Sequence, residues 1–284
     1  MQTIHISDYI REEIPTAQEL KRNTTGLRIG LSDLDCHFRL CSGELTVVAA
    51  RPCMGKTAFA LQVALNNTLF EQISTMFFSL ELSKKFLVTL SASVLAEVSV
   101  KNVMRGDMSE SEEDSITEAL GELSKSKLFI NDTTILTVSD IHKECSEMKR
   151  VNDLGLVVID YVQLINHGYR YKKDIQKLTV ELKQLAVDLN VPVLVTSQLS
   201  RWPLETRSEK RPMLTIDFGK YESIVNAADN VIFIYRDSYY NPDTPDQSKC
   251  ELILEKSKDS HCGTYEVEFV AEWRKFKNWE WRKA

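Results

Sequence analysis

One segment, residues 44–70, restricts the possible folds of this chain more than any other. It consists of a short apolar run rich in β-branched residues (ELTVVAA, 44–50), a turn that ends in Gly55-Lys56-Thr57, and apolar residues at helical spacing over 56–70. A strand that leads through such a turn into a helix directs backbone N–H groups at the helix N-terminus toward a polyphosphate. The order of these elements predicts a phosphate-binding loop at residues 51–57 inside an α/β fold.

The loop itself carries the residue types that a nucleoside triphosphate needs. ARPCMGKT (50–57) matches G-x-x-x-x-G-K-[ST] except at Ala50, which replaces the first glycine. Gly55 permits close approach of the backbone, Lys56 supplies a charge for the β- and γ-phosphates, and Thr57 Oγ ligates Mg²⁺. A chance Gly-Lys-Thr is the alternative, but strand, loop and helix arrive in the required order. We expect ATP and Mg²⁺ as cofactors, and a nucleotide site formed by Arg51, Pro52, Cys53, Met54, Gly55, Lys56, Thr57 and Ala58.

Three polar residues each follow an apolar run that is typical of a parallel strand. Glu81 follows STMFFSL (74–80), Asp160 follows LGLVVI (154–159) and Gln198 follows VPVLVTS (191–197). The carboxyl ends of parallel strands share one edge of a sheet, where ligands of open α/β sheets bind. At that edge Asp160 is expected to hold Mg²⁺, Glu81 to orient or deprotonate the attacking water, and Gln198 to sense the γ-phosphate. Alternatively, each of these residues only ends its strand and has no role at a ligand site. This alternative is strongest for Gln198.

Strands and helices alternate along most of the chain. Further strands are predicted at 127–131, 230–235, 251–255 and 264–270, and further helices at 84–97, 110–125, 138–151 and 172–189. This alternation predicts an α/β fold with a doubly wound, mostly parallel sheet, whose last two strands form an antiparallel edge. Ser109-x-x-Glu112 is a helix-capping signal. We expect an N-terminal helix and linker at 1–23 and one domain over 24–284.

Composition excludes several classes of protein. Of the 284 residues, 43% are hydrophobic and 27% charged, as in an ordinary globular protein. No apolar run approaches the ~20 residues that span a bilayer, and no signal peptide is evident, so we expect a cytoplasmic protein with no membrane partner. The six cysteines and five histidines are dispersed and predict neither disulfides nor a zinc site. The net charge of −6 argues against coating of nucleic acid but allows a local basic channel.

These motifs together resemble the ATPase domain of the DnaB family of hexameric replicative DNA helicases. FSLELS (78–83) is similar to the family's FSLEMS, VIDYVQL (158–164) to its VIDYLQL, and TSQLSR (196–201) to its SQLNR. The phosphate loop differs from the family's mainly at Cys53, where serine is usual. Ala50, which departs from the general motif, is itself usual in this family. TGL (25–27), LSDLD (31–35), KRPML (210–214) and FIYRDSY (233–239) match as well. The resemblance covers residues from about 24 to 279.

The resemblance implies a RecA-like P-loop NTPase fold and an ATP-dependent motor that moves as a ring, a hexamer, along single-stranded DNA and unwinds duplex in replication. It assigns activation of the attacking water to Glu81. The family's KQR segment, whose arginine reaches the γ-phosphate of the adjacent subunit, reads Lys256-Ser-Lys258 here. Lys258 would then act across the interface, and Lys256 would belong to the nucleotide-binding set. A helicase loader or a primase is a further implied partner.

A basic stretch at 201–220 is the candidate for contact with single-stranded DNA. In a six-membered ring, six copies of this stretch would line the channel and follow a phosphate backbone. The alternative is that the stretch is an exposed, solvated loop. The C-terminal residues 272–283 interleave basic with aromatic residues. Packing is expected there for Trp273 and Phe276, with Trp279 or Trp281 as candidates for stacking on bases. The DNA-binding candidates of the basic stretch are Arg201, Arg207, Lys210 and Lys220.

Departures from the family pattern keep a second function open. The family's DLRESG, whose RESG loop touches the DNA backbone, corresponds to DFGKYE (217–222), with Gly219 and Lys220 at the arginine and glutamate positions. A lysine at 258 keeps the charge but lacks arginine's planar fork. Family members usually carry an N-terminal helical domain of about a hundred residues, where this sequence has 1–23. The alternatives are a helicase-derived regulatory or scaffold ATPase with weak or no unwinding, and a recombinase-like filament.

Overall fold

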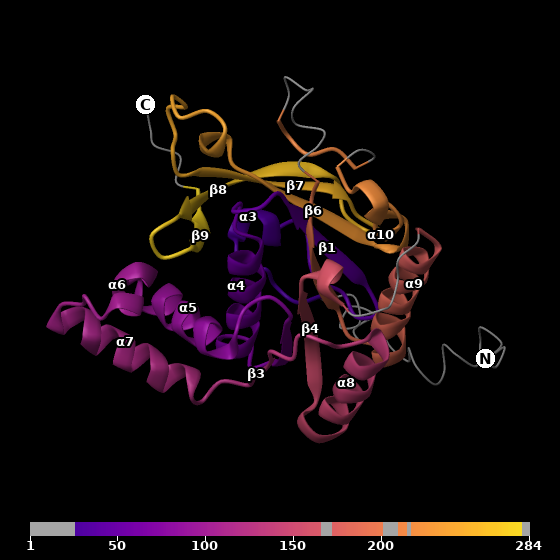
Figure 1. The fold of residues 1–284 in the computed structure, drawn as a ribbon, viewed down its shortest axis with the longest axis horizontal. Helices are drawn as coiled ribbons and strands as arrows, with labels where there is room; N and C mark the ends of the chain where they lie inside the picture. The colour runs from indigo at the N-terminus through magenta and orange to yellow at the C-terminus, as the bar shows by residue number, and fades with distance from the viewer. Residues whose placement is uncertain (1–25, 166–171, 201–209, 215–216, 280–284) are drawn as a thin grey trace.

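A nine-stranded sheet organises the protein (Figure 1). The structure, a computed structural model, describes residues 26–165, 172–200, 210–214 and 217–279, and the predicted N-terminal helix and linker lie outside these residues. The strand order is β3-β2-β4-β5-β1-β6-β7-β8-β9. No helix in the described part of the chain has the length and apolarity to span a bilayer.

Six neighbouring strands run parallel and three antiparallel, which confirms the predicted doubly wound, mostly parallel sheet with an antiparallel edge. The antiparallel edge has three strands instead of the two expected. The third, β9, contains Phe276, whose ring is buried, as its predicted packing role requires. The parallel strands are β1 Leu45–Ala50, β2 Ser74–Ser79, β3 Leu128–Asn131, β4 Leu154–Asp160, β5 Val193–Gln198 and β6 Asn230–Tyr235; the others are β7 Lys249–Lys256, β8 Gly263–Val270 and β9 Lys275–Asn278.

Most helices begin and end close to the predicted positions. Capping boxes fix two of the starts: Ser109 caps one helix through Glu112, and Thr137 caps the next through Asp140. Each satisfies backbone N–H groups that a helix N-terminus leaves unpaired. Within the described residues the helices are α3 Ser32–Asp35, α4 Lys56–Leu69, α5 Lys84–Ala96, α6 Val100–Arg105, α7 Glu110–Leu123, α8 Val138–Asn152, α9 Lys172–Leu189 and α10 Ser223–Ala227, with short 3-10 turns at η1 Val162–Leu164, η3 Gly219–Tyr221 and η4 Asp237–Tyr239.

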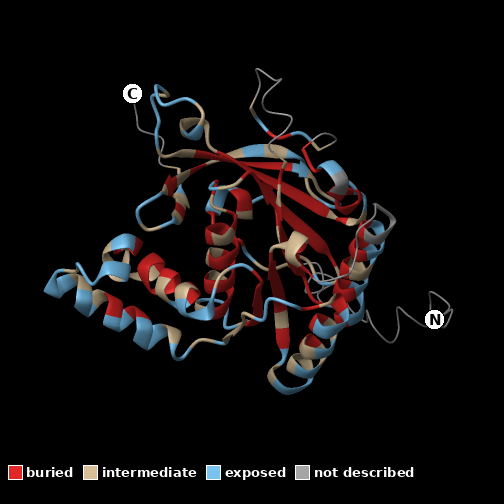
Figure 2. Ribbon diagram, in the orientation of Figure 1, coloured by how far each residue is buried: buried red, intermediate tan, exposed pale blue. Residues whose placement is uncertain are grey.

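The sheet has an apolar core on each face because alternate residues of its central strands point in opposite directions. Val47 and Ala49 of β1 pack in the core that includes α8, α9 and α10. Val48 and Ala50 pack in the core that includes α4 and α5. Figure 2 shows burial concentrated in the central strands and α4. Burial on both faces explains why the central strands are continuous apolar runs in the sequence.

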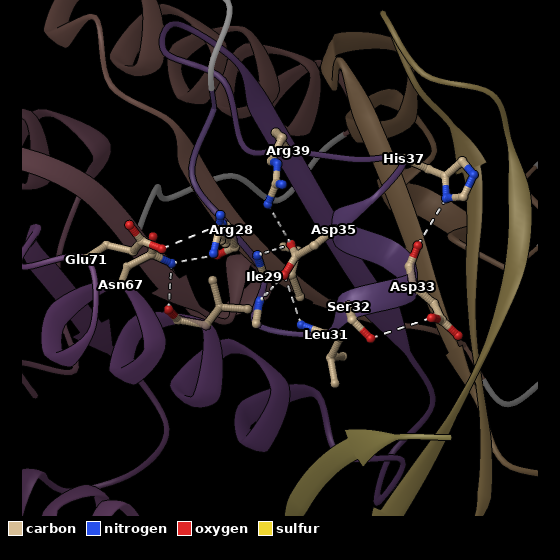
Figure 3. Close-up of polar contacts among 12 residues, drawn as sticks. Arg28, Ile29, Leu31, Ser32, Asp33, Asp35, His37, Arg39, Asn67 and Glu71 are labelled. Atoms are coloured by element: carbon tan, nitrogen blue, oxygen red, sulfur yellow. Dashed lines mark hydrogen bonds and ion pairs between the residues drawn. The ribbon is translucent and has the colours of Figure 1, made fainter. Parts of the chain in front are cut away.

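The segment before β1 is fixed to α4 by polar contacts (Figure 3). The Asp35 carboxylate accepts hydrogen bonds from the backbone N–H groups of Ile29 (2.7 Å) and Leu31 (3.1 Å). The buried Asn67 of α4 donates to the carbonyl of Arg28 at 2.8 Å. Asp35 therefore fixes the backbone of residues 29–31, and Asn67 attaches the neighbouring Arg28 to the helix that begins at the phosphate loop.

Candidate nucleotide-binding site

The phosphate loop joins β1 to α4, as its sequence predicts. Gly55 lies just before α4 with φ +102°, a left-handed conformation that L-residues rarely adopt. A Cβ atom there would lie 3.1 Å from Phe276 Cζ and 3.2 Å from Phe269 Cε2. The backbone conformation therefore favours glycine, and any other residue would also force the two rings to shift by a few tenths of an ångström.

Thr57 and Asp160 meet directly beneath the loop. Thr57 Oγ1 donates to Asp160 Oδ2 at 2.7 Å, and Thr196 Oγ1 donates to the other carboxylate oxygen at 2.5 Å. Asp160 is fully buried. Burial raises the pKa of its carboxyl, while the two hydroxyl hydrogen bonds and the charge of Lys56 act in the opposite direction. A hydroxyl and a carboxylate are hard oxygen donors, so the pair fits a Mg²⁺ ion.

Lys56, the first residue of α4, has a largely buried side chain. Burial lowers the pKa of its ammonium, and the carboxylates of Asp160 and Glu81 oppose that shift. Its Nζ lies 5.9 Å from the centre of the Tyr161 ring. A positive charge held in such a partly desolvated place interacts more strongly with phosphate than it would in water.

One cavity brings four of the predicted residues together. It has a volume of about 430 Å³ and is lined by Lys56, Thr57, Glu81 and Gln198. The parallel registers explain this, because Ser79 pairs with Asp160 and Ala50 pairs with Gln198. The strand-end residues therefore share one edge of the sheet, as the sequence predicts. Pro52, Cys53, Gly55 and Ala58 also line the cavity.

The main chain of Gln198 is fixed by Gln163, which follows β4. The Gln163 side-chain amide donates to the Gln198 carbonyl at 3.0 Å and to Ser197 Oγ at 2.9 Å, and it accepts from the Gln198 N–H at 3.1 Å. Gln163 was not among the predicted site residues. It connects the end of the Asp160 strand with the end of the Gln198 strand.

The cavity wall also contains residues that the sequence did not indicate, namely Arg236, Phe269 and Arg274. The Arg236 guanidinium carbon lies 4.5 Å from the centre of the Phe269 ring. Its Nε is buried without a hydrogen-bond partner among the described residues, and burial lowers the pKa of the guanidinium. Arg236 follows the apolar run NVIFIY just as Glu81 and Gln198 follow theirs, so the same strand-end rule could have found it.

Two of the predicted loop residues turn their side chains away from the cavity. The Arg51 guanidinium forms a buried ion pair with Asp217, with Nη2 2.6 Å from Oδ1. Met54 is buried in the apolar core next to α4. Only the backbone of these two residues can face a phosphate.

Lys256 and Lys258 lie away from the cavity. β7 runs antiparallel to β6 and Lys256 pairs with Val231, so this end of β7 lies at the opposite edge of the sheet. Lys256 Nζ donates to the carbonyls of Val225 (2.8 Å) and Ala228 (2.6 Å). The exposed Lys258 ammonium lies 3.5 Å from the Glu44 carboxylate, which raises the pKa of the lysine. Neither lysine lines the cavity that contains Lys56 and Thr57 of the same chain.

The candidates for DNA contact are only partly described. Arg201, Arg207 and the side chain of Lys220 lie outside the described residues, as does Trp281. The carbonyl of Lys210 accepts a hydrogen bond from Arg51 Nη1 at 2.9 Å. Arg211, in the same stretch, forms a two-pronged ion pair with Glu251 at 2.7 and 2.8 Å, which offsets part of the local positive charge.

Comparison of the sequence with known protein families supports the nucleotide-binding site described above. The family described as DnaB-like helicase C terminal domain matches residues 26–278. The chain belongs to this family. A replicative DNA helicase DnaB of Geobacillus stearothermophilus is 38% identical over 91% of the chain, and a replicative DNA helicase DnaC of Bacillus subtilis is 36% identical over 98%. The chain spans 58% and 63% of the length of these two relatives.

Two solved structures confirm the RecA-like fold. One of them, described as an ATPase domain, superposes with a TM-score of 0.90 at 30% identity, covering 98% of this chain and all of that one. The other, a DnaB-like replicative helicase whose structure was reported with its interactions with primase, superposes with a TM-score of 0.86 at 30% identity. That match covers 98% of this chain and 68% of the helicase.

Proposed function

We propose that this chain is the ATP-hydrolysing motor of a ring-forming replicative DNA helicase that moves along single-stranded DNA. The relatives named replicative DNA helicases, at 36% and 38% identity, support this activity. A cytoplasmic location and a loader or primase as partner belong to the same proposal, since one structural relative is described with its interactions with primase.

One observation carries the proposal: a single cavity is lined by Lys56, Thr57, Glu81 and Gln198, with Asp160 hydrogen-bonded to Thr57 beneath it. Lys56 would neutralise the β- and γ-phosphates, and loop N–H groups would donate to the phosphate oxygens. Glu81 would orient the attacking water and accept its proton. Gln198 would respond to the γ-phosphate.

Thr57 and Asp160 would hold Mg²⁺, which would neutralise charge on the phosphates during transfer. The stacked Arg236 and Phe269 present a flat, cationic surface at the cavity wall. A nucleotide base can stack on such a surface. We therefore propose the same cavity for the whole of the ATP molecule.

The opposite placement of Lys258 supports a ring in which each nucleotide site is completed by the next copy. Lys56 and Lys258 lie at opposite edges of one sheet, so a head-to-tail contact between copies would bring them together. Contacts of this kind generate closed rings when the rotation between copies closes. The DNA-facing segment in the ring centre would be 201–220.

The decisive experiment measures ATP turnover with and without single-stranded DNA, together with displacement of a labelled strand from a forked duplex. We expect DNA to stimulate turnover and the protein to displace the strand. Lys56→Ala should abolish both, and Lys101→Ala, which removes an exposed lysine from α6, should change neither. An ATP turnover rate that DNA does not change, combined with no strand displacement, would refute the proposal.

A second candidate is a helicase-derived regulatory or scaffold ATPase, and the contact of Lys258 with Glu44 favours it. A lysine held by a carboxylate and lacking a planar fork is a weak partner for a γ-phosphate. Under this alternative ATP would bind without efficient unwinding, and Lys258→Arg would leave strand displacement absent. A rise in both turnover and strand displacement for Lys258→Arg would instead identify a motor with a weakened interface residue.

A further inference from the structure

A carboxylate just before β1 contacts the lysine at the edge of the sheet opposite the nucleotide cavity. The Glu44 carboxylate lies 3.5 Å from the ammonium of Lys258, which follows β7. The two partners differ in exposure: the side chain of Glu44 is 7% exposed and that of Lys258 is 57% exposed. Because lysine has a flexible four-carbon stem, the ammonium can leave this contact, whereas the carboxylate is enclosed by protein.

Asn230, a buried residue at the start of β6, fixes both partners of this pair. Its Nδ2 donates to Glu44 Oε2 at 2.9 Å. Its Oδ1 accepts from the backbone N–H of Lys258 at 3.2 Å and from Ser257 Oγ at 3.0 Å. One amide therefore holds both the carboxylate and the main chain of Lys258, and the stem of Lys258 is the part that can move.

Glu44 is the strongest of the negative charges that act on this lysine. The carboxylates of Glu44, Asp229 and Asp259 all raise the pKa of the Lys258 ammonium, and Glu44 has the largest effect. Asp229 is itself paired with Lys183 at 2.7 Å. Asp259 is exposed, so water and salt screen its attraction. The Glu44 carboxylate therefore decides where the ammonium lies within its own chain.

A phosphate that approaches Lys258 competes with Glu44 for the same ammonium. The pair borders a cavity of about 610 Å³, which leaves room for an approaching group. Transfer of the ammonium to a phosphate would leave a nearly buried carboxylate without its ion-pair partner, which is unfavourable. Because Lys258 is exposed, a pair of this kind changes an equilibrium constant by no more than about fivefold.

We propose that Glu44 competes with the γ-phosphate of a neighbouring copy's nucleotide for the Lys258 ammonium, and thereby lowers the affinity of the assembled site for a triphosphate. The role of Lys258 at that phosphate rests on the function proposed above. Glu44 acts through Lys258 and does not itself touch the nucleotide. Its effect is therefore specific to nucleotides with a γ-phosphate, because a diphosphate lacks the group that Lys258 would contact.

The test compares the affinity for a non-hydrolysable ATP analogue with the affinity for ADP, without DNA and at a protein concentration at which the copies associate. Glu44→Gln removes the charge but keeps an oxygen that can accept from Asn230. This variant should bind the analogue about fivefold more tightly than the wild-type protein does, and should bind ADP equally well. An unchanged or weaker affinity for the analogue would overturn the proposal, as would an equal gain for ADP.

Two further variants show whether the effect passes through Lys258. In the Lys258→Ala protein, the additional change Glu44→Gln should leave the affinity for the analogue unchanged, because the shared ammonium is absent. A gain that persists without Lys258 would contradict the proposal. Glu181→Gln removes the same charge from a matched pair on α9, in which the Lys177 ammonium lies 3.6 Å from the carboxylate. It should keep both wild-type affinities, and a fivefold gain there would assign the effect to net charge instead of to Glu44.

A measurement on the wild-type protein separates this proposal from folding defects and from the helicase proposal. In trace acylation read by mass spectrometry, Lys258 should react more slowly than Lys101, an exposed lysine of α6. The reason is that an ammonium beside a carboxylate loses its proton less readily. Equal rates would overturn the proposal, because the pair would then not form in solution. Turnover without DNA stimulation or strand displacement would refute the helicase, while affinities measured without DNA would still decide the role of Glu44.

Discussion

Gln163 illustrates how one side chain can set the position of another that faces the nucleotide. Its amide pairs with both the N–H and the carbonyl of Gln198. We expect Gln163→Met to lower ATP turnover by about 100-fold with little change in nucleotide affinity, because misplacing a reacting group by about 1 Å has effects of this size. Single-turnover kinetics and nucleotide titration would separate the two quantities.

A matched control exists for this prediction. Gln62 pairs with the N–H and carbonyl of Phe276 through the same two-pronged amide geometry, both at 2.8 Å. Gln62→Met should therefore lose comparable hydrogen bonds while leaving turnover near the wild-type rate. Equal losses of turnover in the two variants would mean that Gln163 acts only through stability.

The placement of the strand-end residues was the most predictable part of the site. Glu81, Asp160 and Gln198 each terminate an apolar run, and parallel pairing alone brings such ends to one edge. Phe269 and Gln163 could not be inferred in this way. Phe269 of β8 lines the cavity through a contact with the phosphate loop, which is distant in sequence, and the position of Gln163 depends on the 3-10 turn η1 after β4.

At the scale of elements, the long helices and the strands with continuous apolar runs were predicted, whereas three short elements were not. The helices α4, α5, α7, α8 and α9 each have 13 residues or more, enough for a helical pattern to repeat. The elements α6, α10 and β9 have 6, 5 and 4 residues. Their conformation depends on neighbours that are distant in sequence, as for β9, which pairs with β8 and packs on α4.

The capping box of α7 permits a quantitative prediction. Ser109 Oγ accepts from the Glu112 N–H, and the Glu112 carboxylate accepts from the Ser109 N–H. Ser109→Ala should lower the free energy of unfolding by about 1 kcal/mol, as measured by urea denaturation. Ser115→Ala removes a serine from the exposed interior of the same helix and should have no such effect. A loss of equal size in Ser115→Ala would contradict the capping interpretation.

For the whole molecule, strand direction decides which residues can share a site. Parallel β1, β2, β4 and β5 bring Lys56, Glu81, Asp160 and Gln198 to one edge. The reversed β7 takes Lys258 to the other edge, near Glu44. A single chain thus carries the two parts of the proposed catalytic site on opposite sides. The role of Lys258 could be suggested from the sequence motif alone. Its separation from the phosphate loop could be recognised only once the fold was known.

This separation predicts complementation between two inactive variants. Lys56→Ala lacks the phosphate-loop charge and Lys258→Ala lacks the residue offered to the neighbour, so each alone should have little ATP turnover with DNA. In an equal, random mixture about a quarter of the head-to-tail interfaces would join an intact Lys56 to an intact Lys258. Turnover should therefore recover after the two proteins are dissociated, mixed and reassembled.

The same mixture made without dissociation is the control and should stay inactive while subunits do not exchange. If Lys258 acted on the nucleotide of its own chain, every active site in the mixture would lack one of the two lysines, and no recovery would occur. Recovery requires that Lys56 and Lys258 come from different copies. The experiment thus tests whether the opposite edges of this sheet meet in a working assembly.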